Sequence, residues 1–186
     1  SAGAVFYNNT ILSETNVIGA TNVHWRNNLF LGEQSADEIF SVTTLSSYSS
    51  SDYNGFRPNS AEVSFRWQAP TSKTLVDVTN PNYEAELESM EFATLTDYST
   101  ATGQDRNSVL VDYDIFINVP PLDARDSESL QTLYNAADLD FRLRSGSAAI
   151  DRGAILPGIT DDFNGEAPDL GALEFGADTP IYGPRP

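Results

Sequence analysis

His24 and Arg26 are the pair of residues whose types and spacing most directly point to chemistry. One residue separates them in the run VHWRNN, so in an extended strand both side chains lie on the same face. An imidazole can take a proton from carbon, and a guanidinium beside it can neutralise a carboxylate and stabilise an enolate-like intermediate. His24 is the only histidine, so a Ser-His-Asp triad would also have to use it. The alternative is that both are ordinary exposed strand residues.

The composition limits the classes of partner. The chain has 186 residues, enough for one domain with its own core, and a formal net charge of −17. Such a surface repels phosphate backbones and anionic lipids, so we expect neither nucleic-acid binding nor docking on membranes. No apolar run is long enough for a membrane span. The absence of cysteine excludes disulfides and thiolate metal sites.

A repeat near the N-terminus indicates the elements that would position His24. The run VFYNNTIL returns as HWRNNLFL, and SDYNGF is a looser third copy. Short apolar runs broken by a polar corner at such a period are typical of a solenoid. Asparagine tolerates left-handed backbone and can both donate to and accept from the asparagine of the next coil. We therefore predict an asparagine ladder, whose members would be Asn8, Asn9, Asn27, Asn28 and Asn54.

Two hairpin turns of an antiparallel sandwich are the alternative, although the pair NN lacks the glycine that tight hairpins prefer. Alternation along the strands places Val23 and Trp25 in the core. It leaves His24 and Arg26 on the outer wall, together with Val5 and Tyr7 of the preceding coil.

The single domain is expected to have three parts: regular coils over 1–59, irregular coils over 60–118, and an acidic loop with a capping tail over 119–186. A short helix is predicted near 92–101, with Thr94 or Ser89 as its cap and Gly103 as its end. The run SVLVDYDIFIN, residues 108–118, is predicted to be a strand.

The tail carries a resemblance to a known group of proteins. DFRLRSGSAAIDRG followed by DDFNGEAPDLGALEFG resembles the closing segment of bacterial secreted right-handed parallel β-helix proteins of the pectate-lyase-like superfamily. FATLTDYSTATGQDRNSVLVDYDIF resembles a segment that often precedes it, and NNTIL and WRNNLFL match coils of that group. The resemblance implies an all-β fold: a right-handed parallel β-helix with one short helix and a long C-terminal capping tail.

The same resemblance implies a bacterial protein that is secreted, periplasmic or on the cell surface. Its expected partner is a polysaccharide, which it would cleave as a lyase or glycoside hydrolase. In the lyases that the chain resembles, Lys or Arg usually serves as the base, often with Ca²⁺. A non-catalytic carbohydrate-binding protein or surface solenoid is the alternative, because this fold does not fix activity.

On this hypothesis His24 and Arg26 would be catalytic. Further cations and rings could bind the polymer; these are Tyr7, Tyr53, Arg57, Arg66 and Lys73. A hydrolase would instead need paired carboxylates, for which the candidates are Asp52, Asp77, Asp112 and Asp114. A non-catalytic binder would present exposed aromatic rings, for which the candidates are Tyr7, Tyr48, Tyr53, Trp67 and Tyr98.

The acidic tail offers a possible Ca²⁺ site made of Asp161, Asp162, Asn164 and Glu166, although it lacks the full alternating pattern of a calcium loop. Asp151, Asp162 and Asp169 are expected to be turn and capping residues.

The chain opens without Met and is strand-like from Val5, which is typical of an interior piece of a longer polypeptide. An edge at Val5 to Leu12 would be open and apolar, so we expect a cover for it. The first candidate is the N-terminal portion of the same protein, as a separate fragment or chain, and the second is self-pairing into a dimer.

Overall fold

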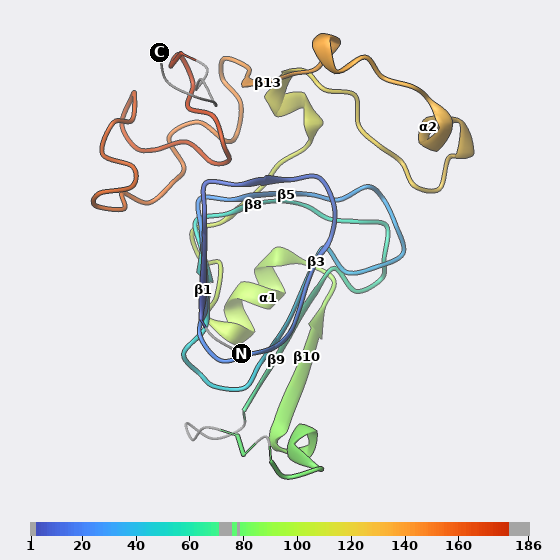
Figure 1. Ribbon diagram of the computed structural model, residues 1–186, viewed down its shortest axis with the longest axis vertical. Helices are drawn as coiled ribbons and strands as arrows, with labels where there is room; N and C mark the ends of the chain where they lie inside the picture. The colour runs from blue at the N-terminus through green and yellow to red at the C-terminus, as the bar shows by residue number, and fades with distance from the viewer. Residues whose placement is uncertain (1–2, 71–75, 78, 179–186) are drawn as a thin grey trace.

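The computed structural model describes residues 3–70, 76–77 and 79–178 (Figure 1). Its N-terminal part consists of three sheets with the strand orders β1-β4-β7, β2-β5-β8-β11 and β3-β6-β9-β10. In Figure 1, β1, β3 and the pair β5 and β8 outline three sides of a ring of chain. The strands are β1 (Ala4–Tyr7), β2 (Thr10–Ile11), β3 (Thr15–Ala20), β4 (Val23–Arg26), β5 (Leu29–Leu31), β6 (Phe40–Thr44), β7 (Ser50–Asp52), β8 (Gly55–Arg57), β9 (Phe65–Pro70), β10 (Leu87–Phe92) and β11 (Val109–Leu110).

Parallel pairing sets the copies of the sequence repeat beside one another. Trp25 of β4 lies opposite Phe6 of β1, and Phe30 of β5 lies between Ile11 of β2 and Phe56 of β8. Inward-facing rings therefore stack from strand to strand, as Phe30 and Phe56 do at 5.1 Å. This stacking buries apolar area, the largest favourable contribution to folding.

The predicted asparagine ladder is confirmed for Asn9, Asn28 and Asn54. Asn9 Nδ2 donates to Asn28 Oδ1 at 2.9 Å, and Asn28 Nδ2 donates to Asn54 Oδ1 at 3.0 Å. The residues just before them, Asn8 and Asn27, have φ of 54° and 59°, which is the left-handed backbone that asparagine tolerates. The ladder thus satisfies polar groups that the turns would otherwise bury unpaired.

Asp105 closes the ladder at the far end from Asn9. Its Oδ1 accepts from Asn54 Nδ2 at 3.0 Å and from the Ser108 hydroxyl at 2.6 Å. Its Oδ2 and the hydroxyl of Tyr98 are both buried without a hydrogen-bond partner. Burial raises the pKa of Asp105, partly offset by its hydrogen bonds to Ser108, Asn54 and Ser51.

Replacing Asp105 with asparagine is expected to stabilise the chain by about 1–3 kcal/mol near neutral pH, because a buried charge becomes a neutral amide that can donate to Tyr98. The folded pKa is raised, so the stability contributed by the protonated carboxyl is present in acid. It is lost as the pH rises through the folded pKa. The gain from Asp105→Asn should therefore shrink in acid. Urea unfolding as a function of pH measures it, with the exposed Asp178→Asn as control. A gain that does not change with pH would contradict this account.

Two apolar clusters form the core. The first lies between the three sheets and contains Trp25, Phe40 and Phe65, all fully or nearly fully buried. The second contains Leu29, Ile115 and Leu170, which join the strands to the C-terminal segments. Because β5 contributes to both clusters, with Phe30 in the first and Leu29 in the second, the two cores share a wall.

Helix α1 (Leu95–Thr102) begins later than the predicted range 92–101, but it has Thr94, one of the two predicted caps, and ends at Gly103 as predicted. The Thr94 hydroxyl accepts from the amide of Asp97, and Gly103 ends the helix with φ of 75°. Tyr98 of α1 is fully buried and stacks on Phe65 at 5.1 Å, so the helix covers one end of the first core (Figure 1). None of the helices in the described part of the chain is long and apolar enough to cross a membrane.

The predicted fold class, an all-β right-handed parallel β-helix with one short helix, is wrong. The chain is mixed α/β, with 14% helix and 30% strand in several separate sheets rather than one solenoid of stacked rungs. The physical reason is that the repeat ends near Arg57. Beyond it, β10 runs antiparallel to β9, and β12 pairs antiparallel with β13 in a sheet of its own.

The single strand predicted over 108–118 is wrong, because β11, a 3₁₀ helix (η2) and β12 occupy these residues, and the other remaining elements lie outside this range. The remaining elements are η1 (Tyr83–Glu86), η2 (Tyr113–Ile115), β12 (Phe116–Asn118), α2 (Ser127–Gln131), η3 (Ala136–Asp138) and β13 (Asp140–Leu143). The η elements are short 3₁₀ helices. Residues 108–118 do not form one strand, because Asp112 accepts from the amide of Tyr113 and starts a 3₁₀ turn there.

The C-terminal tail is docked on the first strands by backbone contacts. Asn27 exchanges two side-chain hydrogen bonds with the backbone of Ala154, at 2.9 and 2.7 Å. The amide of Gly171 donates to the Asn27 carbonyl at 2.8 Å. Asp151 and Asp169 accept from tail amides, including Glu166 to Asp151 at 2.7 Å and Phe175 to Asp169 at 2.6 Å. Their predicted roles in turns are therefore confirmed.

Gly171→Ala is expected to destabilise the chain by about 2–3 kcal/mol, because it adds both strain and overpacking. Gly171 has φ of 95°, and a Cβ there would lie 2.6 Å from Leu29 Cδ1. Gly176→Ala is the matched control, since φ is 75° but no atom lies within 4 Å of the added carbon. Thermal unfolding of both variants separates the two effects. Equal losses would contradict the close approach at Gly171.

Candidate functional site

The outer face of the sheet β1-β4-β7 carries the predicted catalytic pair. Parallel register aligns Val5, His24 and Ser50 in one column of this face, and Tyr7, Arg26 and Asp52 in the next. The intervening residues point inward, and Trp25 is only 1% exposed. The prediction that His24 and Arg26 share an outer face with Trp25 in the core is confirmed. We call this surface the His24 face.

His24 is held on both ring nitrogens. Its Nε2 lies 2.6 Å from Asn22 Oδ1, and its Nδ1 lies 2.8 Å from the Ser50 hydroxyl. An amide oxygen only accepts, so Nε2 carries the proton and Nδ1 is left as the acceptor. The Ser50 hydroxyl therefore donates to Nδ1, and the lone pair of the base points at Ser50 Oγ.

Arg26 converges on the same serine from the neighbouring column. Its Nη2 donates to Ser50 Oγ at 2.9 Å, and its Nη1 donates to the carbonyl oxygens of Trp25 at 2.6 Å and Ser50 at 3.3 Å. One hydroxyl thus joins the imidazole to the guanidinium. A cation donating to Ser50 Oγ favours the deprotonated form of that oxygen.

His24 is a neutral base on this face. Partial burial lowers the pKa of His24, and the positive charge of Arg26 lowers it further. Since the ordinary value is 6.5, the ring is largely unprotonated at neutral pH. An imidazole in this state can accept a proton at Nδ1.

Tyr48 supplies an exposed ring beside the base. It is 73% exposed and meets the His24 ring edge-on, with centroids 6.5 Å apart. Tyr7 lies opposite Arg26 in the strand register and is partly exposed. The His24 face therefore combines a base, a cation and aromatic surface. Such rings are suited to stacking on sugars.

The other predicted substrate contacts do not gather on this face. Arg57 is paired with Asp112 at 2.7 Å and lies over the Tyr113 ring, with only 13% of its side chain exposed. Arg66 lies on another sheet, 3.6 Å from Glu91. Tyr53 occupies a left-handed turn position after β7, with φ of 55°. Lys73 lies outside the described residues.

Two of the aromatic rings that were predicted to be exposed for sugar binding are part of the core instead. Trp67 is 5% exposed and Tyr98 is fully buried, so neither ring can meet a polymer. Trp67 faces inward because it alternates with Arg66 and Gln68 along β9.

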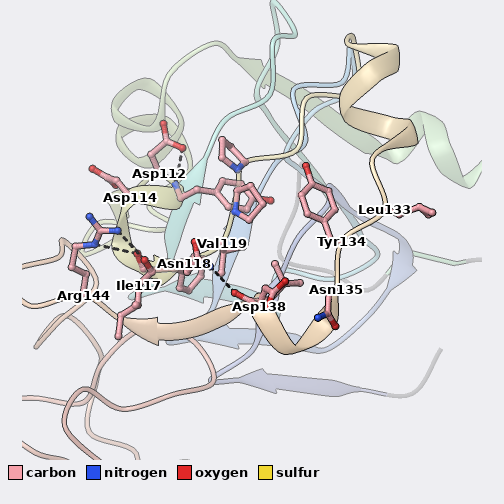
Figure 2. A pocket seen from close by; sticks show the side chains of 15 residues that line it. Asp112, Asp114, Ile117, Asn118, Val119, Leu133, Tyr134, Asn135, Asp138 and Arg144 are labelled. Atoms are coloured by element: carbon pink, nitrogen blue, oxygen red, sulfur yellow. Dashed lines mark hydrogen bonds between the residues drawn. The ribbon is translucent and has the colours of Figure 1, made fainter.

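A cavity of about 600 Å³ lies away from the His24 face, between the segment 112–121 and the segment 133–144 (Figure 2). Two of the carboxylates considered for hydrolysis, Asp112 and Asp114, line it. Figure 2 shows Tyr134 and Asn135 across the cavity from them. The carboxylate of Asp112 accepts a hydrogen bond from Arg57. The side chain of Asn118 donates to the Asp138 carbonyl at 2.6 Å, which links the two segments that line the cavity.

The remaining two hydrolase candidates serve turns. Asp52 accepts from the amide and the side chain of Asn107, both at 2.8 Å. Asp77 accepts from Thr79, and this hydrogen bond lowers the pKa of Asp77. The structure thus does not assemble the four carboxylates into one site.

The residues predicted to bind Ca²⁺ do not form a ligand set. Asp161 accepts from the Gly158 amide, and the Asn164 side chain donates to the Phe175 carbonyl. The amide of Glu166 donates to Asp151, which orients the backbone of this loop. Across the described residues, no three acidic or histidine side chains come together as metal ligands. The residues present therefore do not fit the ion.

Sequence reasoning missed Ser50 and Asn22, which orient the imidazole. A signal for Ser50 was present: aligning Asn54 with Asn28 places Ser50 opposite His24, as the strand register has it. Asn22 lies two residues before His24, on the same face of the chain, but an asparagine at that position is too common to single out.

Comparison of the sequence with known protein families, with curated proteins and with solved structures found no match, so the geometry of the His24 face carries the functional argument.

Proposed function

We propose that the chain is part of a secreted, polysaccharide-active bacterial protein, and that its His24 face cleaves an acidic glycan by β-elimination. The observation that carries this proposal is the single hydroxyl of Ser50, which joins a neutral imidazole to a guanidinium. Elimination next to a uronate carboxylate needs these two groups, a base for the proton and a cation for the developing negative charge.

The hydrogen bonds define a path for the proton. Ser50 Oγ is the atom that meets the substrate, because the lone pair of His24 Nδ1 already points at it. As Oγ takes the proton from the carbon beside the carboxylate, its own proton passes to Nδ1. Asn22 accepts from Nε2 and stabilises the imidazolium that forms.

The electrons of the broken C–H bond form the new double bond, and the glycosidic C–O bond breaks. The imidazolium can return its proton through Ser50 to the departing oxygen, which balances the reaction without a further reagent. Arg26 donates to Ser50 Oγ and brings positive charge to the place where the uronate carboxylate would lie. Tyr48 would stack on a neighbouring sugar ring.

The test is a screen of uronic-acid polymers for the ultraviolet absorbance of unsaturated products, with neutral glycans as controls. An increase in absorbance that requires His24 supports elimination. New reducing ends without absorbance would instead mean hydrolysis. No cleavage of any polymer would overturn the proposal for this chain.

Non-catalytic glycan binding is the second candidate, and the cavity of Figure 2 favours it. The Tyr134 ring is 49% exposed at that cavity, beside amide and carboxylate groups that can bond sugar hydroxyls. A binder of this kind would give no product in the screen, so binding has to be measured separately. Retention of a glycan by the chain, lost in Tyr134→Ala but kept in His24→Ala, would place binding at the cavity.

A further inference from the structure

The end of the strand region that carries β1, β2 and β3 is open on all three sheets. Each of these strands is the last in its sheet order. On one side of each, the described residues supply no pairing strand. Unpaired strand edges are templates for adding further strands.

The asparagine ladder gives this end a chemical direction. Asn28 Oδ1 accepts from both the backbone amide and the side-chain amide of Asn9, at 3.1 and 2.9 Å. Asn54 Oδ1 accepts the same pair of donors from Asn28, both at 3.0 Å. The backbone donors fix which atom of each side chain is the oxygen. From one asparagine to the next, the side-chain amide therefore donates away from the open end, while Asn28 Nδ2 also donates to the Phe6 carbonyl of β1.

One acceptor is left over at that end. Within the part of the chain that the structure describes, no hydrogen bond reaches Asn9 Oδ1, although its equivalents each receive two. At the opposite end the ladder closes on the carboxylate of Asp105, which accepts from Asn54 and has no amide to donate to a further asparagine. The two ends are thus chemically different: Asp105 is enclosed by the chain, with its Oδ2 buried, whereas the acceptor of Asn9 lies at an open strand edge.

The apolar columns are uncovered at the same end. Phe6 stacks on Trp25 at 6.0 Å but is 38% exposed, against 1% for Trp25. In the next column Ile11 is partly exposed, although Phe30 beneath it is fully buried. The side chains of Phe6 and Ile11 are therefore uncovered at the same end as the free acceptor, Asn9 Oδ1.

We propose that this end is a docking surface for a segment of another polypeptide, which adds parallel strands to β1 and β2 and sets an asparagine on Asn9 Oδ1. The asparagine would supply a backbone donor and a side-chain donor, as Asn9 and Asn28 do. Its apolar neighbours would cover Phe6 and Ile11. An N-terminal part of the same protein meets this requirement if it repeats the apolar-Asn-Asn pattern.

A second copy of this chain cannot supply the donor that Asn9 Oδ1 requires. Two copies meeting through their open ends would bring two Asn9 acceptors together without a donor. In a head-to-tail arrangement the open end would meet the opposite end, where Asp105 already closes the ladder and Tyr98 of α1 covers Phe65. The direction of the ladder therefore favours a different chain.

A peptide copied from the chain itself is a suitable probe. Residues 23–31, VHWRNNLFL, form the β4–β5 unit that already pairs with β1 and β2 from the other side. The control peptide carries Asn28→Asp, which keeps the shape but loses the amide donor. Fluorescence anisotropy with the full chain should show binding of the first peptide and about tenfold weaker binding of the control, the effect of one hydrogen bond.

Hydrogen exchange locates the contact. The bound peptide should protect the amides of 4–11 and leave those of β10 unchanged. Absence of binding by the first peptide, or equal binding of both peptides, would overturn the proposal. A dimer of the chain alone that protects 4–11 would also overturn it, because a second copy would then be the occupant.

Discussion

Asn28→Leu is expected to lower the free energy of unfolding by about 3–5 kcal/mol, since several buried groups each lose a partner at about 1–3 kcal/mol. Asn28 is fully buried and is the middle member of the ladder. Its side chain donates to the carbonyl oxygens of Phe6 at 2.9 Å and Arg26 at 3.0 Å, as well as to Asn54. It also accepts both donors of Asn9. Leucine has a similar volume but can replace none of these bonds.

Urea unfolding measures this loss, and Asn16→Leu is the matched control. Asn16 lies in β3 with its side chain exposed, so the same substitution there should change stability by no more than about 0.5 kcal/mol. If Asn28→Leu cost no more than Asn16→Leu, the ladder would be a consequence of the fold and would contribute little to its stability.

His24→Ala is expected to reduce kcat on the cleaved glycan by about 10²–10⁴-fold, the usual contribution of a positioned acid or base. Ser50→Ala should cause a loss of similar size, because Ser50 Oγ lies between the imidazole and the substrate in the proposed path. Tyr48→Ala should act mainly on KM, because it removes only the stacking surface.

Arg66→Ala is the control for charge. It removes a cation from another sheet, where Arg66 pairs with Glu91, and activity should be unchanged. The pH profile gives a further check. Rates should fall as the pH drops through the lowered pKa of His24, below 6.5. In Arg26→Gln that limb should move to higher pH, because the charge that helps to lower the pKa is gone. Activity that survives in His24→Ala would exclude this residue as the base.

The ladder and the His24 face could be predicted because local patterns determine them. An asparagine repeated inside apolar runs is buried and needs a hydrogen-bond partner, which the equivalent asparagine of the next copy supplies. Alternation alone separates Trp25 from His24 and Arg26. The cap and the end of α1 are equally local, since Thr94 and Gly103 act within one turn.

Features that depend on distant residues could not be predicted. Asp105 closes the ladder 51 residues after Asn54, beyond the end of the repeat, and nothing in its neighbourhood marks it as buried. Trp67 and Tyr98 were possible sugar platforms until packing placed both in one cluster. The fold class failed for the same reason, because regular stacking was extrapolated past the last copy of the repeat, where β10 and the pair β12 and β13 are antiparallel.

The docking of the tail has a consequence for how the chain is made. Hydrogen bonds join Asn27 to Ala154 and Thr10 to Ala172, across 127 and 162 positions of sequence. During synthesis the first strands therefore leave the ribosome long before the residues that fasten them. Contacts between such distant residues form slowly, and a growing chain with exposed strand edges is prone to aggregate. Translation speed and chaperone supply should then limit the yield of native protein more strongly than its final stability does.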